Sequence, residues 1–248
     1  MRRHIFYTAG CTQALSFAAA QLRYKGFDFA KQPDSTVTHI LLDVPSFQSD
    51  GTLKNGSKIQ DVLTGTSSNV TVIGGNLQSF VPEDYPTIDL LQDPGYTAEN
   101  ADITAHCAVK IAIQKLPVTF KHCHVLVVGW GRIGKCLARL LRDMGAYVTV
   151  AARKPEDRAI LSALNYDTVN TSAMGYELLR YRVIFNTVPE MVLPKDIVQY
   201  CRNDCLKIDL ASVKGIDSGD VIWARGLPNK EVPETSGTLI AKTVLRLI

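Results

Sequence analysis

The sequence predicts an α/β protein with two domains, each built around a parallel sheet. The chain has 248 residues, which is comfortable for two domains at roughly 100–200 residues each. Short apolar strands alternate with helical segments along the chain, and this order requires parallel strands joined by crossover helices. A glycine-rich turn follows one of the buried strands, as in folds that bind dinucleotides. We therefore expect a smaller flavodoxin-like N-terminal domain and a C-terminal dinucleotide-binding domain of the Rossmann type.

The composition is that of an ordinary globular protein. Hydrophobic residues make up 46% of the chain, charged residues make up 21%, and the formal net charge is +3. Because the charge is small and the basic residues are scattered, we expect no binding to nucleic acid. The apolar run near the N-terminus is interrupted by Gly10, Thr12 and Gln13, unlike a signal peptide. No apolar segment reaches the ~18 residues of a membrane span, so we expect a cytoplasmic protein that does not enter a membrane.

The cysteine pattern predicts neither disulfides nor a metal site. None of the six cysteines forms a C-x-x-C pair, and their spacing matches no zinc framework. His122 and His124 could together hold a metal ion on one face of a strand. The alternative, which we favour, is that they form the turn into a buried strand. No metal is therefore predicted.

The N-terminal domain is predicted over residues 1–97. Its expected strands are His4–Thr8, Thr38–Val44, Val70–Gly75 and Thr87–Leu91. Residues 13–26 have apolar positions at helical spacing, and Gly26 provides the C-terminal stop. The segment DPGYTAEN is rich in turn residues and marks the edge of the domain. An interdomain segment, residues 98–118, then contains a helix from about Ala101 to Leu116.

The C-terminal domain is predicted over residues 119–230, followed by a helix at 231–248 that closes the cleft. Its helices are expected at 132–146 and 155–165, the second with a proline in its first turn. Its strands are expected at 124–129, 147–152, 183–189, 206–212 and 220–228. The first of these, HVLVVG, is apolar on both faces, as a strand buried inside a parallel sheet must be.

The glycine-rich turn matches the pattern G-x-G-x-x-G. It lies between a buried strand and a helix, inside a strand–helix–strand unit, which is the context that gives the pattern meaning. The glycines allow a tight turn, approach of the backbone to a pyrophosphate, and close packing of helix on strand. The free N–H groups of the helix N-terminus favour the phosphates. The residues of the turn are Gly129, Trp130, Gly131, Arg132, Ile133 and Gly134.

The next strand indicates which dinucleotide binds. Sites selective for NAD place a carboxylate about 20 residues beyond the glycine turn to bond the ribose hydroxyls. This chain has Ala152, Arg153 and Lys154 there. A guanidinium can bond a 2′-phosphate with two parallel hydrogen bonds, whereas a carboxylate would repel it. We therefore predict NADP, with NAD less favoured; the alternative is that Arg153 is only a surface cation.

Polar and small residues follow the later strands, where ligands bind in open parallel sheets. We expect cofactor contacts from Asn186, Thr187, Val188, Pro189, Asp209 and Ala211. We expect contacts to an anionic substrate from Ser212, Gly226, Leu227, Pro228, Thr235 and Ser236. Each of these residues could instead be an ordinary cap or turn, and for Thr235 the capping role is equally favoured.

Three residues are candidates for catalysis. His106 on the interdomain helix could act as an acid or base, although a single histidine is more often structural. Lys214 follows the strand that ends in Asp209 and could clamp an anion. Ser212 precedes it in the same segment.

Several segments together resemble the family of the A-type subunit of dipicolinate synthase. They are FNTVPEMVL, KIDLASVKG, ARGLPNKEVPETSGTLIAKTVLRLI, and the run from NADITAHC through VLVVGWGRIGKC to VAARK. The likeness runs from about Asn100 to the C-terminus, and its blocks occur in the family's order. Two departures stand out: His106 replaces the family's usual Glu, and Val213, Lys214 and Gly215 replace Arg-Pro-Gly-Gly.

The resemblance implies oxidation of dihydrodipicolinate to dipicolinate with a nicotinamide cofactor. It further implies a flavoprotein-like second component (the B-type subunit), the mother cell of a sporulating bacterium as the location, and a fold similar to the D-2-hydroxyacid dehydrogenases. Under this interpretation, Arg132, Lys214 and the N-terminus of the last helix anchor the carboxylates of the small dicarboxylate substrate. We also expect a homo-oligomer. The alternatives are a related dehydrogenase with another small carboxylate substrate and a non-catalytic nucleotide-binding or scaffold subunit.

Overall fold

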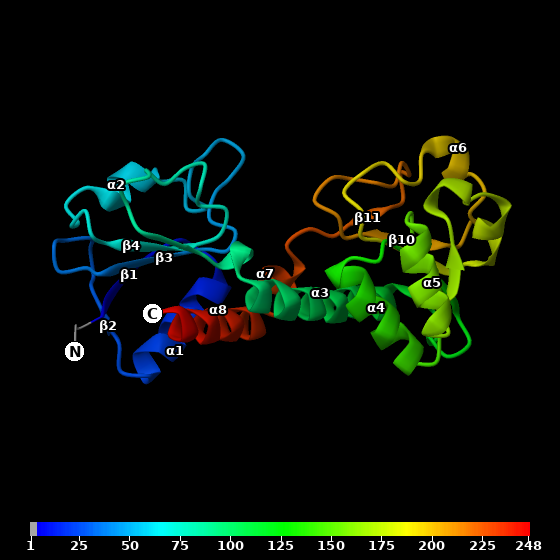
Figure 1. Cartoon of the computed structure of the whole chain (residues 1–248), viewed down its shortest axis with the longest axis horizontal. Coiled ribbons are helices and arrows are strands. Elements are labelled where there is room, and N and C mark those ends of the chain that lie inside the picture. Colours follow the sequence, from blue (N-terminus) through cyan, green and yellow to red (C-terminus); the bar gives the residue numbers. More distant parts are fainter. Residues whose placement is uncertain (1–3) are drawn as a thin grey trace. The chain divides into compact units, whose positions relative to one another are not determined.

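The computed structural model describes residues 4–248. The first three residues, which open the N-terminal run considered above as a signal peptide, lie outside the described residues. The chain divides into two compact units (Figure 1). Unit 1 comprises Met1–Asn100 and Pro228–Ile248, and unit 2 comprises Ala101–Leu227. The last 21 residues group with unit 1, and most of the interdomain segment expected at 98–118 groups with unit 2. The domain bounds given above stay a prediction.

Unit 1 contains a five-stranded parallel sheet in the order β2-β1-β3-β4-β5. The strands are β1 (Ile5–Ala9), β2 (Asp28–Phe29), β3 (His39–Leu42), β4 (Thr71–Gly74) and β5 (Thr87–Asp89). The helices wholly within this unit are α1 (Gln13–Tyr24), the short α2 (Ile59–Leu63), the 3-10 turn η1 (Leu90–Gln92) and α8 (Pro233–Leu247). Helix α7 (Leu227–Glu231) begins at the last residue of unit 2 and continues in unit 1. The predicted strands are thus confirmed with shorter ends, while β2 and α2 were not predicted. Both are too short to show a periodic pattern.

The two long helices of unit 1, α1 and α8, pack against each other (Figure 1). Gly237 permits this contact, since a Cβ there would lie 2.5 Å from both the carbonyl oxygen of Ala14 and Cβ of Phe17. At the start of α8, the Ser236 hydroxyl donates to Asn229 Oδ1 (2.8 Å), and the Asn229 amide donates to the Val44 carbonyl (2.9 Å). The last helix is therefore held within unit 1 by packing and by hydrogen bonds.

Replacing Gly237 by Val should destabilise unit 1 by about 1–3 kcal/mol, because backbone atoms of α1 would have to move away. Thermal unfolding monitored by circular dichroism measures this loss. Gly219→Val is the matched control, since Gly219 is not among the glycines with positive φ and nothing lies within 4 Å of an added Cβ there. Equal stability of the two variants would show that the helices do not need their close contact.

Helix α3 (Pro94–Lys115) begins seven residues before the predicted start at Ala101 and includes all but the first residue of the supposed turn DPGYTAEN. Asp93 explains the difference, because its Oδ1 accepts a hydrogen bond from the Tyr96 backbone N–H (2.6 Å). An acceptor side chain before the helix, followed by a proline in the first turn, is an N-terminal helix signal. The turn prediction was therefore wrong, and the segment continues as one 22-residue helix.

Unit 2 contains a six-stranded parallel sheet in the order β11-β10-β9-β6-β7-β8. The strands are β6 (His124–Val128), β7 (Tyr147–Ala151), β8 (Asp167–Val169), β9 (Val183–Asn186), β10 (Leu206–Asp209) and β11 (Ile222–Trp223). The helices wholly within the unit are α4 (Arg132–Asp143), α5 (Pro155–Ala163), α6 (Lys195–Val198), and the 3-10 turns η2 (Thr171–Ala173) and η3 (Tyr176–Arg180). From β8 to β11, this is the doubly wound order of dinucleotide-binding domains, and the direction of winding changes between β6 and β9. The predicted α/β fold class is confirmed for both units.

Candidate functional site

The glycine turn follows β6, next to the point where the strand order reverses. Gly129 has a φ of +105°, and a Cβ there would collide with the Thr187 side chain at the end of β9. A Cβ at Gly134 would collide with the carbonyl oxygen of Gly129, so helix α4 can lie this close only with glycine. Gly131, by contrast, has no heavy atom within 4 Å of an added Cβ. The turn is therefore closed toward the sheet and open on its outer side.

The N-terminus of α4 is available to an anionic ligand. Its N-cap is Gly131, which has no side chain to bond the first N–H groups. Unpaired N–H groups and the helix dipole together favour phosphate groups at such an end. The open space beside Gly131 and this uncapped helix fit the pyrophosphate of a dinucleotide.

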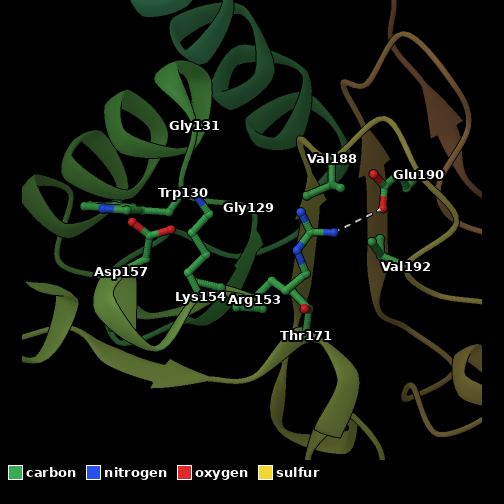
Figure 2. Close-up of a pocket in the computed structure, with 12 residues that line it drawn as sticks. Gly129, Trp130, Gly131, Arg153, Lys154, Asp157, Thr171, Val188, Glu190 and Val192 are labelled. Carbon is green, nitrogen blue, oxygen red and sulfur yellow. Dashed lines mark ion pairs between the residues drawn. The ribbon is translucent and has the colours of Figure 1, made fainter. Parts of the chain in front are cut away.

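A cavity of about 320 Å³ adjoins the glycine turn at the carboxyl ends of β6, β7 and β9 (Figure 2). This volume is at the lower end of the range typical of small-molecule sites. The lining residues are Gly129, Trp130, Gly131, Ala151, Ala152, Arg153, Lys154, Asp157, Thr171, Val188, Glu190 and Val192. We call this cavity the dinucleotide pocket.

Two exposed cations follow β7 and border the dinucleotide pocket. Figure 2 shows the Arg153 side chain reaching toward Glu190 and the Lys154 side chain extending toward the glycine turn. The Arg153 guanidinium lies 3.8 Å from Glu190 Oε2, and both side chains are largely exposed. Arg158 steadies the loop by donating to the carbonyls of Ala152 (2.9 Å) and Arg153 (2.7 Å). The loop after β7 thus presents positive charge where NAD-selective sites have a carboxylate.

The indole of Trp130 forms one side of the dinucleotide pocket. Its ring meets Tyr166 edge-on at 5.9 Å between centroids, and the Lys135 ammonium lies 5.6 Å from the ring centre. These contacts hold a flat apolar surface beside the glycine turn.

Asn186 and Asp209, both predicted to contact the cofactor, are fully buried and bonded to each other. The Asn186 amide donates to Asp209 Oδ1 (3.0 Å) and to the Val188 carbonyl, and its oxygen accepts from Val188 N–H. Asp209 also accepts from the backbone N–H groups of Ala211 (3.0 Å) and Gly215 (2.7 Å). The pair therefore shapes the loops after β9 and β10, the first of which carries Val188 and Glu190 to the dinucleotide pocket. Direct contact of either side chain with a cofactor stays a prediction.

The structure brings seven predicted cofactor residues together in the dinucleotide pocket, namely Gly129, Trp130, Gly131, Ala152, Arg153, Lys154 and Val188. The other predicted cofactor residues do not line it: Arg132, Ile133, Gly134, Asn186, Thr187, Pro189, Asp209 and Ala211. Among these, Thr187 bonds the Val128 carbonyl (2.9 Å), while Arg132 and Pro189 are exposed.

Sequence reasoning did not predict Asp157, Thr171, Glu190 and Val192 as lining residues. Of these, Glu190 matters most because it is paired with Arg153. The sequence did offer one signal that Glu190 could line the pocket. Glu190 lies four residues beyond Asn186, in the loop that follows β9, and β9 borders the point where the strand order reverses.

His106 lies on α3 within unit 2, exposed and outside the dinucleotide pocket. Its Nε2 is 3.7 Å from Asp102 Oδ2, and Arg139 of α4 also pairs with Asp102 (3.3 Å). The Cys136 thiol lies near Asp102, and its pKa is raised. The main cause is burial of the thiol, and the second is the negative charge of the Asp102 carboxylate. The thiol is therefore held protonated and is not an activated nucleophile.

The remaining candidate residues lie in both units, and none of them lines the dinucleotide pocket. Lys214 is half-buried and donates to the Ser218 carbonyl (3.4 Å), while Ser212 and Gly226 are exposed. Leu227, Pro228 and Ser236 are buried, and Thr235 is exposed on α8. Their roles toward a substrate stay predictions.

Residues 4–248 contain neither a metal-binding cluster nor a membrane-spanning helix. Among these residues, no group of three or more His, Cys, Asp and Glu side chains is arranged to hold a metal ion. None of the helices in the same part of the chain combines the length and the apolar content needed to cross a bilayer.

Comparison with known proteins shows what the chain is similar to. No family model matches it. It is 24% identical to the A-type subunit of dipicolinate synthase from Bacillus subtilis over 202 residues, which cover 76% of this chain and 68% of that protein. The crystal structure of the corresponding dipicolinate synthase subunit from Bacillus halodurans superposes with a TM-score of 0.86 at 22% identity, covering 100% of this chain and 98% of the other.

A transhydrogenase from Sinorhizobium meliloti is more distant, with a TM-score of 0.72 at 14% identity over 98% of this chain and 93% of the other. At this low identity the comparison shows that the two proteins share a fold. The resemblance predicted from the sequence is therefore confirmed: the chain is similar to the A-type subunit of dipicolinate synthase in sequence and in fold.

Proposed function

We propose that the protein is an NADP-dependent oxidoreductase similar to the A-type subunit of dipicolinate synthase, and that it oxidises dihydrodipicolinate to dipicolinate. One observation carries the proposal: the glycine turn and the Arg153–Lys154 pair border a single pocket at the strand-order reversal of unit 2. The similarity to the dipicolinate synthase proteins supports the substrate class.

The residues present fit a dinucleotide phosphate. The open side of Gly131 and the first turn of α4 would hold the pyrophosphate, while the Trp130 indole offers a flat surface beside it. Arg153 and Lys154 would neutralise a 2′-phosphate, which a carboxylate at their position would repel. When bound, the nicotinamide would supply the hydride acceptor, and the chain would orient it and exclude competing reactions.

For the substrate we propose a small cyclic dicarboxylate. Arg132, at the first residue of α4, and Lys214 would pair with its carboxylates, and Ser212 and Gly226 of the same unit would donate hydrogen bonds. His106 is the proposed proton acceptor. By the same resemblance we propose the flavoprotein-like B-type subunit of dipicolinate synthase for a partner, a homo-oligomeric assembly, and a location in the cytoplasm of a sporulating mother cell.

Glu190 should weaken NADP binding in the wild-type protein, because its carboxylate pairs with Arg153 and would face the 2′-phosphate. An exposed pair at this distance contributes about 0–1 kcal/mol. Glu190→Gln should therefore bind NADP⁺ a few-fold more tightly, measured by isothermal titration calorimetry, with little change for NAD⁺. Glu156→Gln, which removes an exposed carboxylate from the first turn of α5, is the control. Unchanged affinity of the Glu190 variant would show that its carboxylate does not compete for Arg153.

The test of function is turnover. The purified protein is mixed with NADP⁺ and freshly generated dihydrodipicolinate, with and without the candidate partner subunit, and NADPH absorbance and dipicolinate are followed together. Matching rates of the two products support the proposal. Bound NADPH without either product would contradict it and leave a related dehydrogenase or a scaffold role.

The variant His106→Ala tests whether the histidine takes part in catalysis, independently of cofactor binding by the dinucleotide pocket. Loss of turnover with unchanged NADP⁺ affinity is the expected result. Full turnover would remove His106 as the proton acceptor without affecting the cofactor assignment.

A further inference from the structure

We propose a second anion site in unit 2, at the opposite end of the sheet from the dinucleotide pocket, that binds a small multivalent oxyanion of the phosphate class. A cleft of about 420 Å³ opens there. We call it the basic cleft. Its charged and imidazole side chains are Lys121, His122, His124, Arg180, Arg182 and Arg202.

The topology separates the basic cleft from the dinucleotide pocket. His124 is the first residue of β6, and Arg182 immediately precedes β9. The dinucleotide pocket instead lies where β6, β7 and β9 end, beyond Val128, Ala151 and Asn186. Because the strands are parallel and a five-residue strand spans roughly 15 Å, one ligand of phosphate size cannot occupy both.

The charges of the basic cleft are not balanced by the protein. Asp204 is shared, since it pairs with both Arg182 and Arg202. Within residues 4–248, Lys121 and Arg180 form no ion pair, although both are exposed at the cleft. Four cations line the cleft, and Asp204 is the one carboxylate that pairs with any of them in the part of the chain that the structure describes. This excess of positive charge favours an anion with more than one negative charge.

The hydrogen-bond donors of the basic cleft are also in excess. Arg182 is only 20% exposed, and its Nε atom is buried without an acceptor among the described residues. Native proteins rarely leave a buried donor unpaired, so each such group needs an explanation. Arg202 already donates from Nε and Nη2 to the two oxygens of Asp204. The exposed cations Lys121 and Arg180 would therefore be the first to bind an oxyanion, and the Arg182–Asp204–Arg202 group would form the positively charged floor behind them.

The two histidines are held at the same edge by Tyr147. His122 adopts a left-handed backbone conformation with a φ of +61°, and its Nδ1 lies 3.0 Å from the Tyr147 hydroxyl. The His124 ring lies 5.0 Å from the Tyr147 ring between centroids. Tyr147 thus holds both imidazoles at the cleft, where a ring N–H can donate to an oxyanion. These contacts, together with the excess of cations, support the proposed oxyanion site.

The experiment titrates the full-length protein with inorganic phosphate and, separately, with pyrophosphate by isothermal calorimetry at constant low ionic strength. The test variant carries Lys121→Gln and Arg180→Gln, two exposed substitutions that leave the paired arginines in place. Its matched control carries Lys195→Gln and Arg225→Gln, which remove two exposed cations of unit 2 that do not line the basic cleft. A third variant, Arg153→Gln, weakens any phosphate binding in the dinucleotide pocket.

We expect saturable pyrophosphate binding by the wild type, the matched control and Arg153→Gln, and binding at least about tenfold weaker in the test variant. Preference for pyrophosphate over inorganic phosphate would indicate a phosphorylated metabolite as the ligand, and the reverse would indicate free phosphate. Equal affinity in the test variant and its control would overturn the proposal. Loss of all binding in Arg153→Gln would also overturn it, because the dinucleotide pocket would then be the site of binding. Absence of saturable binding by the wild type would do the same.

Discussion

Replacing Arg153 by Asp should reverse the coenzyme preference from NADP⁺ to NAD⁺. The change removes a guanidinium that can donate charge-assisted hydrogen bonds, each worth about 1.5–3 kcal/mol, and adds a carboxylate that repels the 2′-phosphate. The Kd for NADP⁺ should rise roughly 100-fold or more. The Kd for NAD⁺ should stay the same or fall, because Asp can accept from the ribose hydroxyls. Calorimetric titration with both coenzymes measures the ratio directly.

Lys195→Asp is the control for this charge reversal, since Lys195 is exposed on α6 of the same unit and does not line the dinucleotide pocket. It should leave the ratio of the two Kd values unchanged. An unchanged ratio in the Arg153 variant would contradict the assignment of NADP. Equal losses for both coenzymes, with an intact circular dichroism spectrum, would place Arg153 in general binding and not in selectivity.

Replacing Asp209 by Ala should have the largest effect on stability. The carboxylate is fully buried and accepts from the Asn186 amide and from two backbone N–H groups. Its removal leaves these donors buried without an acceptor, which costs about 3–5 kcal/mol for a buried charged network. The unfolding transition should move down by roughly 10 °C, as measured by differential scanning calorimetry.

Two further variants isolate the cause of that loss. Asp209→Asn keeps one acceptor oxygen and should lose less stability than Asp209→Ala. Asp217→Ala removes an exposed carboxylate from the loop after β10 and should change the Tm by less than about 1 °C. If Asp209→Ala were as stable as Asp217→Ala, the network would not hold the loops that border the dinucleotide pocket.

The sequence predicted most of the sheet of unit 2 because its strands are apolar on both faces and end in polar residues. The glycine turn was predictable for a similar reason: each glycine meets a separate steric demand, which the structure shows at Gly129 and Gly134. The short strands β2, β8 and β11 were missed or poorly bounded, since two or three residues are too few to show a period.

The interior of the dinucleotide pocket was harder to predict. Arg153 and Lys154 follow a strand at a fixed distance from the glycine turn, so position alone indicated them. Glu190 reaches Arg153 through space from the loop after β9, and no local pattern encodes that meeting. Asn186 and Asp209 were selected as strand-end residues, but a sequence cannot show that a polar side chain turns inward to bond its neighbour.

The assignment of the dinucleotide pocket is tested most directly by a crystal structure of the protein grown with NADP⁺. We predict the pyrophosphate beside Gly131 and the first turn of α4, and the 2′-phosphate within hydrogen-bond distance of Arg153 and Lys154, with Arg153 released from Glu190. A dinucleotide bound with its 2′-phosphate away from Arg153, or bound outside this pocket, would contradict the account.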